Sequence, residues 1–231
     1  MKTLYITLSL FFSLSTMVAL GEPFMDDFNR PDNKKIGNDW STQTDGTITV
    51  EIVNQEALIS GKQATDWVRC GLSRVIDSET KVYFDFLAGE NFNVHIRIDD
   101  TGTGAYMDIY AWPAGPFSYA NSPDGAWPGW IEIPASTMLA GQYNNFGVEK
   151  QNTDFIVYLN DKKIITLKND RLLNITKVLL ASDAAANTAG SLHIDNVIIG
   201  DPTVKPKSVE PSSKVSTLWG RLKSIKFSEN N

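Results

Sequence analysis

The stretch FNVHIRIDDTGTGAYMDIYAW, residues 92–112, contains two runs in which apolar and polar side chains alternate. The apolar members are Phe92, Val94, Ile96 and Ile98 in the first run, and Met107, Ile109 and Ala111 in the second. A period of two is typical of β-strands that bury one face. Residues 100–104 between the runs are Asp, Gly and Thr, and Asp and Gly favour turns. The stretch therefore predicts two antiparallel strands, 93–99 and 105–112.

The same period of two continues from about residue 46 to residue 200. Alternating runs occupy 81–86, 155–159 and 192–199, and Asn160-Asp161-Lys162 has the composition of a hairpin turn. No long run has the period of a helix, and no internal repeat suggests a propeller. Short strands separated by turns indicate an all-β protein, either an antiparallel β-sandwich or a barrel.

The two ends of the chain differ from this central region. Residues 1–21 have a basic start, an uncharged apolar run and a small-residue end, which predicts a cleaved signal peptide, with a membrane anchor as the alternative. Residues 201–213 are a linker rich in Pro and Ser. Residues 214–231 are a short basic amphipathic tail that either docks on a membrane surface or a protein, or is a frayed end. We expect one domain, 22–200, that is secreted, periplasmic or on the cell surface.

The charge and the cysteine content limit which partners the protein can bind and which bonds can stabilise its fold. The formal net charge is −6 at pH 7, and the central region has no dense basic block, so we do not expect a nucleic acid partner. Cys70 is the only cysteine of the sequence, which excludes an intramolecular disulfide. We expect Cys70 to be a buried apolar residue and the fold to depend on burial or on a bound ion.

A motif near residue 26 resembles that of a known superfamily. The chain reads Asp26-Asp27-Phe28-Asn29-Arg30 and then Gly37-Asn38-Asp39-Trp40. This is similar to the Asp-x-Phe-x-Arg … Gly-x-x-Trp opening of secreted bacterial jelly-roll domains of the concanavalin A-like lectin and glucanase superfamily, which includes laminin-G-like domains. The run 192–199 is similar to their last strand. The resemblance covers about residues 24–200 and implies an antiparallel β-sandwich of jelly-roll type.

The resemblance also implies which acidic residues meet. In the resembled folds the first and last strands lie near each other, which would bring Asp26 or Asp27 towards Asp195. Paired carboxylates are oxygen ligands that suit calcium. Asp27 and Asp195 are therefore a candidate site for a structural calcium ion, and we expect no other cofactor. The alternative is that these residues are surface acids that are solvated or in salt bridges.

The superfamily includes glucanases, which place their acids along one strand as Glu-x-Asp-x-x-Glu. The sequence does not contain this pattern, and Glu51 and Glu56 lack the acid between them. Asp99 and Asp100 are adjacent, so on a strand they would point to opposite faces. The sequence has neither a Gly-x-Ser-x-Gly nor a His-Glu-x-x-His motif. We therefore expect that the protein is not an enzyme.

The polar face of the two strands, with the loop 113–130 that we expect after them, combines aromatic rings with charged groups. The residues expected to bind a ligand are His95, Arg97, Asp99, Tyr106, Asp108, Tyr110, Trp112, Tyr119, Trp127 and Trp130. Aromatic rings can stack on the C–H faces of a sugar, while charged groups bind its hydroxyls. For Trp127 and Trp130, the alternative is a small core that holds the loop together.

This face predicts a lectin-like or adhesive module that recognises a polysaccharide or another glycan. Two alternatives remain open. One is a polysaccharide hydrolase or lyase whose acids assemble only in three dimensions. The other is an extracellular sandwich that binds a protein, in which the same aromatic residues would dominate the interface.

Overall fold

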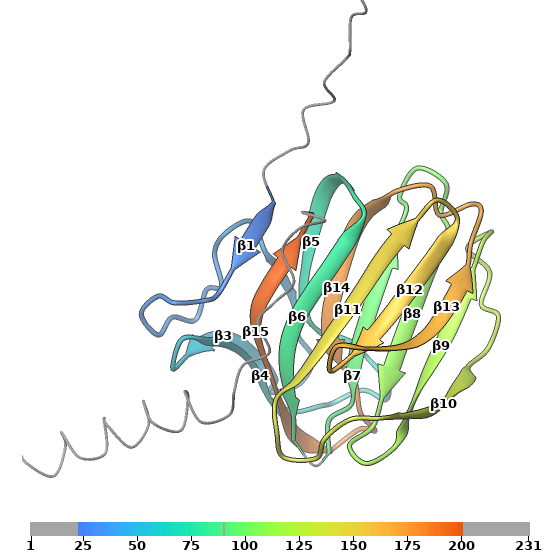
Figure 1. Cartoon of the computed structure of the whole chain (residues 1–231). Coiled ribbons are helices and arrows are strands. Elements are labelled where there is room, and N and C mark those ends of the chain that lie inside the picture. Colours follow the sequence, from blue (N-terminus) through green and yellow to red (C-terminus); the bar gives the residue numbers. More distant parts are fainter. Residues whose placement is uncertain (1–22, 90, 201–231) are drawn as a thin grey trace, which may run out of the picture.

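A computed structural model describes residues 23–89 and 91–200. Within these ranges the chain forms fifteen β-strands in two antiparallel sheets that face each other (Figure 1). The described ranges contain no helix with the length and apolarity that crossing a membrane requires. The predicted signal peptide (1–21), linker (201–213) and tail (214–231) lie outside the described residues.

One sheet has eight strands and the other has seven. The strands of the first are β1 (Phe24–Asp26), β3 (Thr49–Val53), β4 (Glu56–Lys62), β6 (Lys81–Ala88), β11 (Asn144–Gln151), β12 (Asp154–Leu159), β13 (Lys162–Lys168) and β15 (Ala189–Ile199). The strands of the second are β2 (Ser41–Gln43), β5 (Cys70–Glu79), β7 (Val94–Asp99), β8 (Tyr106–Ala111), β9 (Pro116–Ser122), β10 (Ile131–Thr137) and β14 (Ile175–Ser182).

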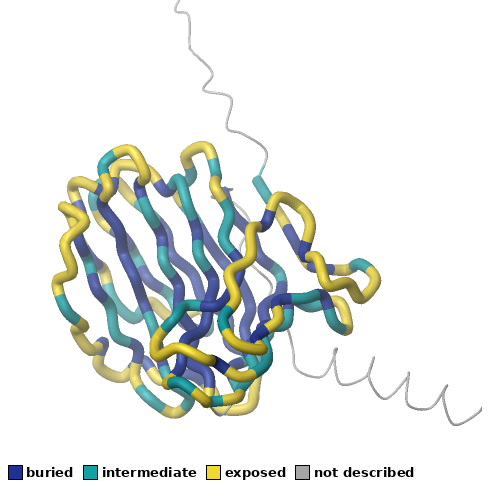
Figure 2. The backbone as a smooth tube through the Cα atoms, turned by 180° about the vertical axis from the view of Figure 1, so that it is seen from behind, coloured by how far each residue is buried: buried dark blue, intermediate teal, exposed yellow. Residues whose placement is uncertain are grey.

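The order of neighbouring strands shows how segments distant in sequence are combined. The larger sheet follows the order β13-β12-β11-β6-β15-β4-β3, with β1 paired to β15. The smaller follows the order β10-β9-β8-β7-β14-β5-β2. Buried and more exposed positions alternate in strands such as β4 and β12, whereas central strands such as β6 and β11 are buried over most of their length. Figure 2 shows buried stretches along the strands and exposed turns. This confirms the predicted all-β antiparallel sandwich of jelly-roll type.

The core between the sheets includes a cluster of phenylalanine side chains. Phe117 of β9 packs edge-on against Phe86 of β6, with ring centroids 6.5 Å apart, and stacks on Phe146 of β11 at 5.8 Å. All three side chains are fully buried. Burying an aromatic side chain of this size contributes roughly 1.5–3 kcal/mol. These contacts join the two sheets, and Cys70 is buried in the same core, as expected.

The motif at residues 26–40 is a small structural unit around a buried carboxylate. Asp26 accepts hydrogen bonds from the indole Nε1 of Trp40 at 2.9 Å and from the backbone N–H of Phe28 at 2.9 Å, and it forms an ion pair with Arg30 at 2.6 Å. Phe28 and Trp40 are buried, as predicted. The acid, the arginine and the tryptophan of the motif are therefore joined by direct bonds.

The residues after Trp112 differ in part from the expectation. Residues 113–130 were expected to be a loop, because they are rich in Pro and Gly, but β9 occupies Pro116–Ser122. Pro116 is the first residue of that strand, where proline is tolerated. Phe117 faces the core with no exposed surface, and its burial favours the strand. The segment 123–130 remains without strand structure and carries Trp127 and Trp130.

Candidate functional site

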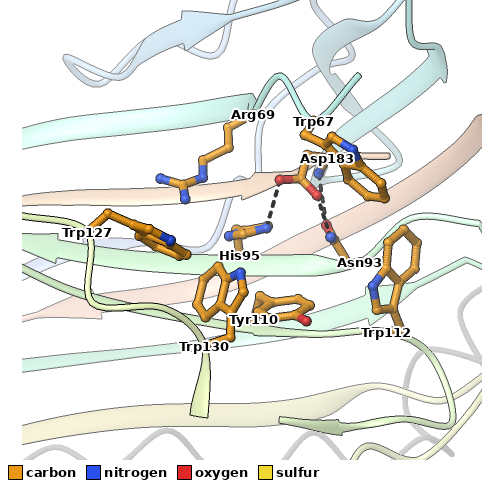
Figure 3. A pocket seen from close by; sticks show the side chains of 9 residues that line it. All are labelled: Trp67, Arg69, Asn93, His95, Tyr110, Trp112, Trp127, Trp130 and Asp183. Carbon is orange, nitrogen blue, oxygen red and sulfur yellow. Dashed lines mark hydrogen bonds and ion pairs between the residues drawn. The ribbon is translucent and has the colours of Figure 1, made fainter. Parts of the chain in front are cut away.

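A pocket of about 460 Å³ lies on the outer face of the seven-stranded sheet, over β7 and β8. In the register of these strands His95 is opposite Tyr110, and both point away from the core side chains Ile96 and Ile109. The pocket is lined by Trp67, Arg69, Asn93, His95, Tyr110, Trp112, Trp127, Trp130 and Asp183, all drawn in Figure 3.

Two loops from distant parts of the chain close one side of the pocket. The segment before β5 carries Trp67, and the segment after β14 carries Asp183. Gln63 joins them, because its side-chain oxygen accepts a hydrogen bond from Ala184 N at 2.9 Å while its amide donates to Val68 O at 2.8 Å. Gln63 is 1% exposed, so this link is shielded from water. The link fixes both loops relative to the sheet.

The floor of the pocket is a buried network centred on His95, which is 2% exposed. Its Nε2 lies 2.9 Å from an oxygen of Asp183, and its Nδ1 lies 3.3 Å from an oxygen of Asp108. The other oxygen of Asp108 forms an ion pair with Arg69 at 2.5 Å, and Asn93 donates to the other oxygen of Asp183. Figure 3 shows Asp183 between His95 and Asn93. The network alternates positive and negative groups.

The charges in this network favour a protonated histidine. Burial by itself lowers the pKa of His95, but the hydrogen bonds and negative charges of Asp108 and Asp183 outweigh it, so the pKa is raised above its ordinary value. For Asp183, burial alone raises the pKa. The hydrogen bond and charge of His95, together with the hydrogen bond of Asn93 and the charge of Arg69, outweigh burial and lower the pKa. The floor therefore favours the protonated form of His95, which lies between the side chains of Asp108 and Asp183.

Aromatic side chains form the two ends of the pocket. Trp127 packs edge-on against Trp130 at 4.9 Å, and Trp130 contacts the ring of Tyr110 at 4.3 Å. At the other end Trp67 packs edge-on against Trp112 at 6.2 Å. Figure 3 shows the two pairs on opposite sides of the polar floor. The arrangement leaves polar groups in the middle and aromatic surface on either side.

Three of these indoles are exposed although they are large and apolar. Trp67 is 58% exposed, Trp127 is 55% exposed and Trp130 is 37% exposed. Trp67 also has a backbone φ of +59°, a left-handed conformation that bulky residues rarely adopt. Strained residues of this kind cluster at functional sites. The contacts of the Gln63 link hold Trp67 in this position.

The pocket gathers half of the residues that the sequence singled out. His95, Tyr110, Trp112, Trp127 and Trp130 line it. The carboxylate of Asp108 lies beneath its floor and has no exposed surface. Trp127 and Trp130 pack on each other, which agrees with the alternative that they form a small core within the loop. They also line the pocket.

Besides Asp108, four predicted residues do not line this pocket. Arg97 and Asp99 line a neighbouring hollow on the same face of the sheet. Tyr106 is 5% exposed and lies under the guanidinium of Arg97 at 3.9 Å. Tyr119 is opposite Ile109 in the register and packs against the core, so it lies on the wrong face of the sheet. The apolar partner of Tyr119 on β8 is the physical reason for this correction.

Sequence reasoning missed four pocket residues, namely Trp67, Arg69, Asn93 and Asp183. Only Asn93 carried a usable signal, because it precedes His95 by two positions and so shares its face. The other three come from connections far from residues 92–112 in sequence. Their position depends on the pairing of β14 with both β5 and β7, which no local pattern specifies.

The predicted calcium site is only partly assembled. β1 pairs with β15, so the first and last strands are adjacent, as the resemblance implied. Asp27, however, is exposed, whereas Asp195 is 3% exposed and lies opposite Asp85 of β6. The described residues contain no group of three or more His, Cys, Asp or Glu side chains that could hold a metal. A calcium ion at Asp27 and Asp195 stays a prediction.

The histidine network predicts how stability depends on pH. The pKa of His95 is higher in the folded than in the unfolded protein. Its contribution to the free energy of unfolding is therefore complete below the unfolded-state pKa of about 6.5 and is lost as pH rises through the folded-state pKa. Asp183, with its lowered pKa, affects stability at acidic pH. Its contribution to the free energy of unfolding is present above about pH 3.8 and is lost as pH falls further. We expect the free energy of unfolding to fall as pH rises from about 6.5 through the folded-state pKa of His95.

Urea unfolding at several pH values within this window measures the effect. His95→Gln keeps hydrogen-bonding groups but removes the titration, so its free energy of unfolding should depend less steeply on pH. The same slope in wild-type and His95→Gln protein would show that the proton is not held at His95.

Comparison with known proteins gives matches in structure but not in sequence. No protein-family model and no curated protein matches the sequence. The Bacillus licheniformis β-glucanase superposes with a TM-score of 0.62 at 12% identity, covering 78% of this chain and 99% of its own. LamA from Z. galactanivorans, in complex with laminaritriose and laminaritetraose, has a TM-score of 0.58 at 13% identity, covering 79% and 100%.

A third solved structure that matches is the Crh5 transglycosylase in complex with NAG. It has a TM-score of 0.59 at 9% identity, and the match covers 80% of this chain and 86% of the transglycosylase. Identities this low establish a common fold and nothing finer. The two sheets, their antiparallel pairing and these superpositions together show that the chain has the concanavalin A-like lectin and glucanase fold.

Proposed function

We propose that the protein binds a carbohydrate in the aromatic pocket and does not cleave it. The observation that carries this proposal is the exposure of Trp67, Trp127 and Trp130 around a polar floor. Exposed indoles cost solubility, and clustered ones indicate a binding surface. In keeping with the basic and apolar start of the sequence, the proposal includes export from the cytoplasm.

Carbohydrate is the ligand class that matches both parts of the pocket. The ring faces of a pyranose are apolar and can stack on indole, while its hydroxyls need donors and acceptors. Asn93, Arg69 and Asp183 provide such groups between the aromatic ends. Two solved structures of the same fold contain sugars, laminari-oligosaccharides in one and NAG in the other, which supports this choice.

The state of the pocket acids favours binding without hydrolysis. A glycosidase needs a protonated acid of raised pKa and a second carboxyl group beside the scissile bond. Asp183 is the only carboxylic acid among the lining residues, and its pKa is lowered. Both of its oxygens already accept hydrogen bonds from His95 and Asn93. The nearby Asp108 has no exposed surface and is paired with Arg69.

A panel of neutral and acidic polysaccharides tests the proposal, with the full chain as the probe in the presence and absence of a calcium chelator. We expect the protein to bind at least one polymer and to release no new reducing ends from it during prolonged incubation. Loss of binding in chelator would support the predicted calcium ion.

Two results would overturn the proposal. New reducing ends that disappear in Asp183→Asn would establish the alternative of a hydrolase, which the glucanase and transglycosylase neighbours make the main competitor. Binding to no glycan at all would reject carbohydrate as the ligand and favour the protein-binding alternative.

A further inference from the structure

A second hollow adjoins the aromatic pocket on the same sheet face. It measures about 670 Å³ and shares Trp67 and Arg69 with the first pocket. Its other lining residues include Arg97, Asp99, Asp100 and Lys177. Because the two hollows share lining residues, a ligand longer than one sugar can extend from the first into the second past the exposed indole of Trp67.

The chemistry of the second hollow differs from that of the first. The second contains a single aromatic residue, Trp67, but three basic side chains, Arg69, Arg97 and Lys177. Its two acids, Asp99 and Asp100, leave a formal excess of one positive charge among the lining residues, three minus two. This excess is local, because the whole chain carries a formal net charge of −6.

The two acids of the hollow are already engaged by other groups. Asp100 accepts four backbone hydrogen bonds, from Gly102 and Thr103 at one oxygen and from Leu173 and Asn174 at the other. It is 4% exposed, so its charge is satisfied inside the loops. An oxygen of Asp99 is bound by Arg97, at 2.8 Å from Nε and 2.7 Å from Nη2.

Lys177 is the basic side chain of this hollow that has no acidic partner. It lies on β14, opposite Asp99 of β7 in the register, and is partly exposed. Across the described ranges it forms no ion pair with an acidic side chain, whereas Arg69 is paired with Asp108 and Arg97 with Asp99. An ammonium group in this position can bind an anionic ligand without first breaking an existing ion pair.

We propose that the second hollow is a subsite for an acidic sugar residue, in which Lys177 binds a carboxylate or sulfate group. This inference rests on the proposed function. One sugar residue occupies the aromatic pocket, the ligand passes Trp67, and the next residue places its anionic group at Lys177. The preferred ligand is therefore an acidic oligosaccharide or polysaccharide rather than a monosaccharide or a neutral glucan.

Matched pairs of polymers test the charge preference. Mannan and polymannuronate share a β-1,4-linked backbone and differ in the carboxylate, whereas laminarin and laminarin sulfate differ in the sulfate. We expect the full chain to bind an acidic member of these pairs at least about tenfold more tightly than its neutral partner. The pair that responds identifies the anionic group. The preference should weaken as salt is added, because partly exposed charges are screened.

The variant Lys177→Met tests whether the preference for acidic polymers depends on this residue. Lys163→Met, on the exposed surface of β13, is the control with the same loss of charge. Lys177→Met should lose the preference for the acidic polymer, about tenfold, and bind the neutral partner as before. Lys163→Met should retain both affinities.

The outcomes separate this inference from the proposed function. Equal or tighter binding of the neutral members would overturn the acidic subsite and leave carbohydrate binding in place. A preference for acidic polymers that survives in Lys177→Met would also overturn it. Binding to none of the four polymers or of the wider glycan panel would reject both proposals together.

Discussion

Trp130→Ala is expected to weaken glycan binding by about thirtyfold or more, which corresponds to roughly 2 kcal/mol. Trp130 contacts the rings of Tyr110 at 4.3 Å, Trp127 at 4.9 Å and His95 at 5.9 Å. It therefore provides stacking surface itself and also orients Trp127. Isothermal titration with the tightest-binding polymer of the panel measures the loss.

Two controls distinguish lost contact from lost folding. Trp130→Phe keeps an aromatic face of smaller area and should retain a large part of the affinity. The thermal unfolding temperature of Trp130→Ala should stay close to that of wild type, because the side chain is 37% exposed. Wild-type affinity in Trp130→Ala would contradict the proposed role of the aromatic pocket.

Asp108→Asn is expected to lower the free energy of unfolding by about 3–5 kcal/mol. The carboxylate of Asp108 has no exposed surface and contacts Arg69 at 2.5 Å and His95 at 3.3 Å. The amide removes the negative charge and leaves a guanidinium and an imidazolium near each other with one fewer counter-charge. The arginine can reach water only in part, since 25% of its side chain is exposed. Urea unfolding at about pH 6 measures the effect.

Asp99→Asn is the matched control, because Asp99 also pairs with an arginine on the same sheet face but is more exposed. Its replacement should cost at most about 1 kcal/mol, as is usual for exposed ion pairs. A loss below about 1 kcal/mol in Asp108→Asn would mean that Asp108 is not the central counter-charge of the network.

The fold could be predicted because its determinants are local. The alternation of Phe92, Val94 and Ile96 with polar residues requires a strand with one buried face, and the structure places all three in the core. The hairpin turn expected at 160–162 consists of Asn160 and Asp161, with φ of +49° and +62° that these residue types tolerate, and Lys162 already begins β13. The motif at residues 26–40 indicated that the β-sandwich is of the jelly-roll type.

The site could be predicted where it follows one pair of strands and the segment after them that carries Trp127 and Trp130. His95 and Tyr110 share a face because of their positions on adjacent strands, so the sequence identified both. Trp67 and Asp183 reach the pocket through the pairing of β14 with β5 and β7, at sequence separations over which periodicity carries no information. The predicted position of Tyr119 was wrong, because the Pro and Gly residues around it suggested a loop where the chain forms β9.

The central claim is that a sugar binds in the aromatic pocket and is not hydrolysed there. The most direct test follows the indole N–H signals of the six tryptophans by NMR while the tightest-binding glycan is added. We predict that the signals of Trp67, Trp112, Trp127 and Trp130 shift with saturation. The signal of Trp40 should stay constant, because its Nε1 is buried and bound to Asp26. Saturable binding that leaves the four pocket signals unmoved would contradict this account.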